Sequence, residues 1–140
     1  MRVLFILSLL LLGACGAKNT KLIMGETTRA DLLAEKGEPL SEHAIPNKDG
    51  TVLKFKDHET VQLKGDIVTN RFTNPKGNQK LVMWWKHKFK DCLTTSQKLA
   101  HDPKSHTPPE TEFACPSEGL SVIYTEGSDF ISRVVENEKK

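Results

Sequence analysis

Residues 51–73, TVLKFKDHETVQLKGDIVTNRFT, carry the pattern on which the fold prediction depends. Apolar and polar residues alternate along this stretch, beginning with Leu53 and Phe55, and the dipeptides Asp57-His58 and Gly65-Asp66 interrupt the alternation. Such interruptions supply turns, and alternation of this kind is typical of an antiparallel sheet with one covered face. The stretch therefore predicts a three-stranded antiparallel meander.

A short helix is predicted just before the meander. Thr27 or Thr28 can accept hydrogen bonds from the first helical amides, and Asp31 follows Thr28 at the spacing of a capping box. Gly37 suits the left-handed position that ends many helices. The helix would pack on the sheet through one face, whose residues are Ala30, Leu33 and Ala34.

Residues 78–99 fit both a strand and a helix. Residues 85–90 alternate as a strand does, whereas four residues recur at helical spacing, namely Leu81, Trp85, Phe89 and Cys92. The segment contains no Gly or Pro and begins with Asn78, a good N-cap. We therefore expect a helix over residues 78–99, with a strand as the alternative.

The C-terminal part predicts a loop over residues 102–112 and a second hairpin over residues 120–136. The resulting order of elements is α-βββ-α-ββ. A chain of 140 residues, 37% of them hydrophobic, is long enough for one domain and hardly for two. We therefore expect a single α+β domain over residues 22–140, with short helices packed on one face of an antiparallel sheet.

The N-terminus has the features of an export signal. Arg2 precedes an apolar run over residues 3–12, and the small residues Gly13-Ala14 follow it. The run is shorter than the roughly 20 apolar residues of a membrane-spanning helix. Leu12-Gly13-Ala14-Cys15 resembles the bacterial lipobox, in which cleavage before the cysteine accompanies acylation of its thiol. Residues 1–14 are thus predicted to be a lipoprotein signal peptide; the alternative is an ordinary secretory signal followed by a cysteine.

Lipid on Cys15, palmitate included, and a tether over residues 15–21 would hold the mature chain at a membrane. Several acyl chains on one cysteine bind a bilayer firmly. By resemblance to lipoprotein sorting in bacteria with two membranes, Gly16 rather than Asp favours the outer membrane, on its periplasmic side. The mature chain would keep 19 basic and 18 acidic residues, a balance that disfavours nucleic-acid binding.

Cys92 and Cys115 are the cysteines that remain beside Cys15. An exported chain lies in an oxidising compartment, where an even pair of cysteines predicts one disulfide. A catalytic or metal-binding cysteine is the alternative, but neither residue lies in a CxxC motif or beside a Cys/His cluster.

Motifs of enzymatic chemistry are absent from the sequence, which contains no GxSxG, P-loop, HExxH or GxGxxG pattern. One polar cluster lies in and beside the predicted loop, at a spacing that fits no standard metal site: His101, Asp102, His106, Glu110 and Glu112. We therefore expect no catalytic, cofactor-binding or metal-binding residue, no cofactor and no enzymatic activity.

One segment carries an excess of positive charge. Residues 76–104 hold seven Lys against two Asp, whereas residues 105–140 hold seven acidic residues against three basic ones. The two segments would neutralise each other if they are neighbours. Alternatively, part of the basic segment faces anionic lipid headgroups or an acidic partner, with an aromatic residue beside the charges. The residues of this candidate surface are Trp84, Lys86, Lys88 and Lys90, whereas Trp85 and Phe89 are expected in the core.

A short motif opens the first predicted helix. Residues 23–33 are IMGETTRADLL, and Gly37-Glu38-Pro39 comes before the meander. This arrangement resembles the SmpA/OmlA domain, a family of small lipoproteins that includes the BamE subunit of the outer-membrane β-barrel assembly machine. The resemblance covers residues 22–73, and residues 78–140 lie outside the usual short domain. It implies the fold, the outer-membrane compartment and a role in outer-membrane protein assembly.

Together these features predict a non-enzymatic, lipid-anchored protein that acts as a binding or scaffold module at the periplasmic face of the outer membrane. Its partners would be the membrane, through the N-terminal lipid, and a protein of the cell envelope. The alternative is a periplasmic protein inhibitor or ligand-binding module that uses the uncovered face of its sheet.

Overall fold

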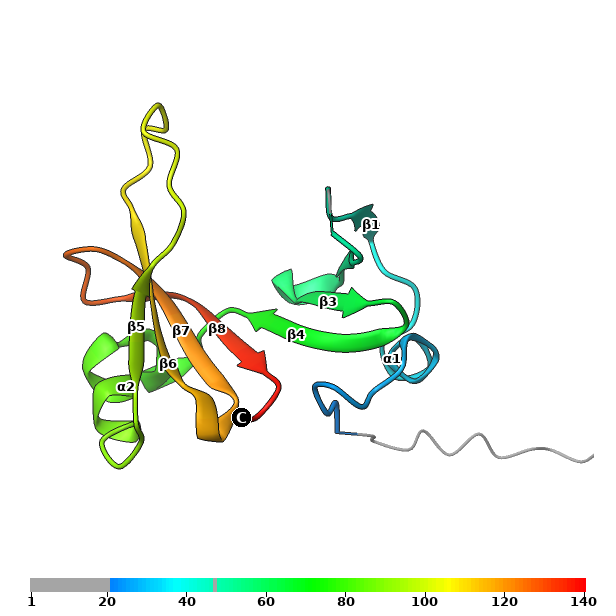
Figure 1. The fold of residues 1–140 in the computed structure, drawn as a ribbon, viewed down its shortest axis with the longest axis horizontal. Coiled ribbons are helices and arrows are strands. Elements are labelled where there is room, and N and C mark those ends of the chain that lie inside the picture. The colour runs from blue at the N-terminus through cyan, green and yellow to red at the C-terminus, as the bar shows by residue number, and fades with distance from the viewer. Residues whose placement is uncertain (1–20, 47) are drawn as a thin grey trace, which may run out of the picture.

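Two α-helices and eight β-strands make up the described part of the chain, which comprises residues 21–46 and 48–140 of a computed structural model (Figure 1). The predicted signal peptide, Cys15 and the predicted tether up to residue 20 lie outside these residues. The α+β class is confirmed. In chain order the elements are α1 (Arg29–Lys36), β1 (Ser41–Ala44), β2 (Thr51–Lys54), β3 (Thr60–Lys64), β4 (Ile67–Thr73), α2 (Val82–Lys88), β5 (Thr95–Lys98), β6 (Glu110–Cys115), β7 (Leu120–Thr125) and β8 (Ile131–Asn137).

The eight strands form one antiparallel sheet with the order β1-β2-β3-β4-β8-β7-β6-β5. Each half of the sheet consists of a helix followed by four strands, α1 with β1–β4 and α2 with β5–β8. The halves meet where β4 pairs with β8, from Asn70 opposite Asn137 to Thr73 opposite Val134. Figure 1 shows this pair of strands as the connection between the two halves.

Local signals in the sequence place α1 and the first meander as predicted. The Thr28 side chain accepts a hydrogen bond from the Asp31 amide, and the Asp31 side chain bonds back to the Thr28 amide. Gly37 ends the helix with φ 77°, a conformation that glycine adopts without a steric penalty. Strands β2, β3 and β4 form the predicted meander, and β7 and β8 form the predicted second hairpin.

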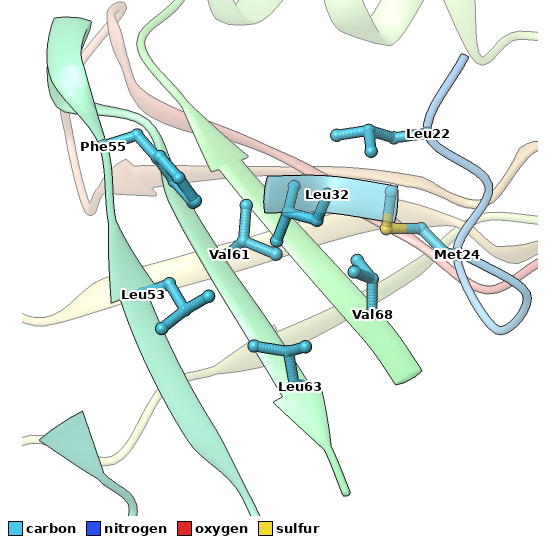
Figure 2. Packing of buried hydrophobic residues seen from close by; sticks show 8 residues of the cluster. All are labelled: Leu22, Met24, Leu32, Leu53, Phe55, Val61, Leu63 and Val68. Atoms are coloured by element: carbon cyan, nitrogen blue, oxygen red, sulfur yellow. The ribbon is translucent and has the colours of Figure 1, made fainter. Parts of the chain in front are cut away.

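The face of α1 that packs on the sheet differs from the prediction. Leu32 is fully buried and Leu33, as predicted, packs partly buried against the same cluster, whereas Ala30 and Ala34 are exposed. Figure 2 shows the Leu32 side chain over the sheet, between Val61 and Val68. A leucine removes much more apolar surface from water than an alanine does, so the helix is oriented by its largest apolar side chain.

The prediction of one helix over residues 78–99 is wrong beyond Lys88. Asn78 lies in a 3₁₀ turn over Gly77–Lys80, α2 begins only at Val82, and Thr95–Lys98 form β5. The disulfide of Cys92 gives a physical reason, because its partner residue ends β6 and β5 pairs along that same strand. Trp85 and Phe89 do lie in the core, at 2% and 1% exposure.

The structure also adds three strands to the predicted order. β1 and β5 are four-residue edge strands, and β6 begins at Glu110, inside the segment predicted as a loop. The order is therefore α-ββββ-α-ββββ rather than α-βββ-α-ββ. None of the three shows the clear alternation of β2 and β3, and each is defined by pairing with a neighbouring strand.

Register places the two hydrophobic clusters on the same side of the sheet. Residues paired across neighbouring strands point to the same face, and one row of pairs crosses five strands, through Leu53, Val61, Arg71, Glu136 and Leu120. The first two residues belong to a cluster under α1, which includes Leu32. Leu120 packs against a second cluster, to which α2 contributes Val82 and Trp85.

Ion pairs fill the space between the two clusters. Arg71 on β4 contacts Glu59 at 2.6 Å and Glu136 on β8 at 3.2 Å, and Lys36 at the end of α1 contacts Glu59 at 2.9 Å. Burial raises the pKa of Glu59, but hydrogen bonds from Lys36 and Arg71 outweigh this effect and hold the pKa below its ordinary value of 4.5. These partners keep the partly buried carboxylate charged and link α1, β4 and β8.

A disulfide joins Cys92 to Cys115, which confirms the predicted pair, and the Cα atoms lie 5.9 Å apart. Cys115 is fully buried in the second cluster. The bond connects the segment after α2 to the end of β6, so it holds the helix against its own half of the sheet.

Replacing Glu59 should give a pH-dependent loss of stability. Glu59→Gln should lower the free energy of unfolding by about 1–3 kcal/mol at about pH 7, because Arg71 and Lys36 lose a charged partner. A lowered pKa means that the native state gains from the charged carboxylate above the unfolded-state value and loses this gain as the pH falls through the folded-state value. The difference from wild type should therefore shrink at about pH 3. Urea unfolding at both pH values measures it.

Glu42→Gln is the matched control, because Glu42 also pairs with an arginine, Arg29, but on the exposed surface. It should change stability by less than Glu59→Gln does. An equal loss in the two variants, or a Glu59→Gln effect that does not change with pH, would contradict the stabilising role of the ion pairs.

Removing the disulfide should destabilise the fold. The double variant Cys92→Ala/Cys115→Ala should lose about 2–5 kcal/mol of unfolding free energy, because a cross-link that closes a loop limits the unfolded chain. Mass spectrometry of non-reduced digests should show the two cysteine peptides linked. Free thiols on both residues in protein purified without reductant would rule the bond out.

Candidate interaction surfaces

Helix α2 brings the four residues of the predicted surface together. Trp84 is half-buried against Trp85, with ring centroids 4.9 Å apart in an edge-on arrangement. The Lys88 ammonium lies 5.8 Å from the centre of the Trp84 ring, within the range of a cation–π contact. Lys86 and Lys90 are exposed.

The acidic C-terminal segment neutralises only part of the basic segment. Lys88 lies 4.0 Å from Glu118, and Lys98 lies 3.2 Å from Glu126. Within the part of the chain that the structure describes, neither Lys86 nor Lys90 forms a salt bridge. The first alternative, mutual neutralisation of the two segments, therefore holds only in part, and the outer side of α2 keeps its positive charge.

Large apolar side chains that the sequence prediction does not include surround the start of α2. Met83 is 79% exposed, Phe130 63% and Leu81 43%. Leu81 and Phe130 pair in an isolated β-bridge, so they lie side by side two residues from Met83. Together with the predicted residues they form what we call the α2 surface: Leu81, Met83, Trp84, Lys86, Lys88, Lys90 and Phe130. The sequence does indicate that Met83 is exposed, because this residue lies off the helical stripe formed by the buried residues Trp85 and Phe89.

The other side of the sheet carries a chain of hydrogen bonds, and we call it the polar face. Asn70 on β4 donates to Asn137 on β8 at 2.6 Å, and Asn137 donates to Ser121 on β7 at 3.1 Å. Glu112 on β6 then accepts from Ser121 at 2.6 Å and from Gln97 on β5 at 2.9 Å. The buried residues of both helices belong to the clusters on the opposite face. The polar side chains of this face therefore hydrogen-bond to one another across the strands.

The polar cluster that begins at His101 does not form a metal site in the structure. Glu110 pairs with Arg133 at 3.0 Å and Glu112 accepts from Ser121, while His101 and His106 are exposed in the loop between β5 and β6. Among residues 21–46 and 48–140, no three His, Cys, Asp or Glu side chains are placed to hold a metal ion. None of the described helices has the length and apolar character needed to span a membrane.

The comparisons with known proteins add no further constraint: no protein-family model, no curated protein and no solved structure matches this chain.

Proposed function

We propose that this protein is a non-enzymatic module, anchored by lipid on Cys15 in the outer membrane and facing the periplasm, that binds or scaffolds proteins of the cell envelope. The observation that carries the proposal is the division of the sheet into a face with two hydrophobic clusters and a polar face that spans five strands. The lipobox motif and the resemblance of residues 22–73 to the SmpA/OmlA domain support the compartment and a role in outer-membrane protein assembly.

The proposal includes an orientation at the membrane. Leu22 and Met24, just after the tether, pack in the cluster under α1, so the chain would leave the anchor on that side of the sheet. The proposal takes both helices to cover this one face, which the row of paired residues supports. The α2 surface would then lie toward anionic lipid headgroups, and the polar face would point away from the membrane.

A periplasmic inhibitor or ligand-binding module is the second candidate, and the polar face favours it. A broad sheet surface with satisfied polar groups can contact another protein without a covering helix. Affinity capture from gently solubilised membranes separates the candidates. Several envelope or barrel-assembly subunits would support the scaffold, whereas one soluble enzyme would support the inhibitor.

Loss of the lipid should release the protein. Cys15→Ser should leave the membrane fraction or remain unprocessed, because electrostatic attraction of the α2 surface alone is screened beyond about 8 Å at physiological salt. Wild-type protein should resist a high-salt wash and dissolve in detergent. If Cys15→Ser is cleaved and still sediments with membranes, lipid on Cys15 is not the anchor.

The α2 surface should contact lipid in the anchored protein. Trp84 and Trp85 are the two tryptophans of the chain and both lie on α2, so the fluorescence reports on this helix. In vesicles that contain anionic brominated lipid, quenching should be strong for wild type. It should fall for Lys86→Glu/Lys90→Glu, because each lysine near such a surface contributes about 1 kcal/mol.

Met83→Asp should also reduce quenching, and Leu40→Asp is its matched control because Leu40 is 68% exposed in the other half of the sheet. Equal quenching in all variants, with every protein still bound to the vesicles, would show that α2 does not face the lipid.

A further inference from the structure

A small pocket lies on the polar face where the two halves of the sheet meet. It has a volume of about 300 Å³, and its lining includes Lys54 from β2, Thr60 from β3, Phe72 from β4 and Arg133 from β8. Phe72 is half-buried and pairs with Val135 of β8. Arg133 is the lining residue that comes from the second half, and the pairing of β4 with β8 brings it to the pocket.

The lining of this pocket suits a negative charge. Lys54 and Arg133 supply two cations, His58, two threonines and two amide side chains can donate hydrogen bonds, and no carboxylate lines the pocket. Arg133 gives one N–H to Glu110 at 3.0 Å, but a guanidinium carries five donors in all. A carboxylate group can be bound by such donors through charge-assisted hydrogen bonds.

The turn beside the pocket has an unfavourable backbone. Asp57 and His58 have φ values of 61° and 60°, in the left-handed region, and they are the non-glycine residues of the described chain with positive φ. Two-residue hairpin turns of this kind favour Asn-Gly. Strained residues cluster at functional sites. Of these two residues, His58 lines the pocket and Asp57 does not.

We propose that this pocket docks an acidic side chain, Asp or Glu, from a loop of a periplasmic protein partner. The volume lies at the lower limit for small-molecule sites, so it fits one or two side chains, and Phe72 offers an apolar contact beside the charge. A lipid partner is disfavoured because the pocket lies on the face opposite the clusters under the helices. This inference rests on the proposed function as a binding module and names the chemistry of the partner.

The test measures binding of a fluorescent peptide that contains two Asp and two Glu, using the full protein purified from membranes in neutral detergent. Anisotropy should show binding of this peptide and none of the same peptide with Asn and Gln. Lys54→Glu should weaken binding about tenfold or more, as expected when an attractive charge becomes repulsive. Lys64→Glu, on the same sheet but outside the pocket, should bind as wild type does.

His58→Gly gives a readout that a purely structural role would not produce. It should raise the melting temperature, because glycine relieves the left-handed backbone, and it should weaken peptide binding. A variant that is more stable and binds equally well would overturn the role of His58.

Equal binding of both peptides, or no effect of Lys54→Glu, would overturn the pocket. Competition by inorganic phosphate as strong as that of the acidic peptide would show a site for small anions and overturn the assignment to a protein loop. The assay needs no membrane, so its failure is distinct from failure of the lipid anchor, which the fractionation of Cys15→Ser tests separately.

Discussion

The pairing of β4 with β8 is the interaction on which the rest of the structure depends. Each half has its own helix and its own hydrophobic cluster, and the clusters share no residue. The halves become one sheet through a short ladder of backbone hydrogen bonds, reinforced on one face by Arg71 and Glu136 and on the other by Asn70 and Asn137. A small number of polar contacts thus determines whether the polar face and its pocket are continuous surfaces.

Features encoded by neighbouring residues can be predicted from the sequence. The capping box of Thr28 and Asp31, the stop at Gly37 and the alternation of β2 and β3 all depend on short-range chemistry. The edge strands cannot be found in this way. Residues 95–98 are all exposed and form a strand because they pair with β6. The end of α2 is also difficult to predict, because the helical spacing of apolar residues continues from Phe89 to Cys92.

The candidate surfaces show the same limit. The pairing of Cys92 with Cys115 follows from counting the cysteines of a chain that is predicted to be exported, and the cluster around Trp84 follows from the composition of its segment. Phe130 joins the α2 surface from a hairpin far along the chain, and the basic pocket combines Lys54 with Arg133 across two halves. Both need the strand register, which a single sequence does not provide, so local patterns do not reveal surfaces made by distant segments.

Amide hydrogen exchange in β4 and β8 is the most direct test, because the polar face and its pocket require the two halves to act as one sheet. We predict that the paired amides of residues 70–73 and 134–137 exchange as slowly as those of the inner strands β3 and β7. Exchange as fast as in the edge strands β1 and β5 would show that the halves separate readily. The polar face would then not be a stable surface, which would contradict both its proposed role in binding and the pocket that spans the two halves.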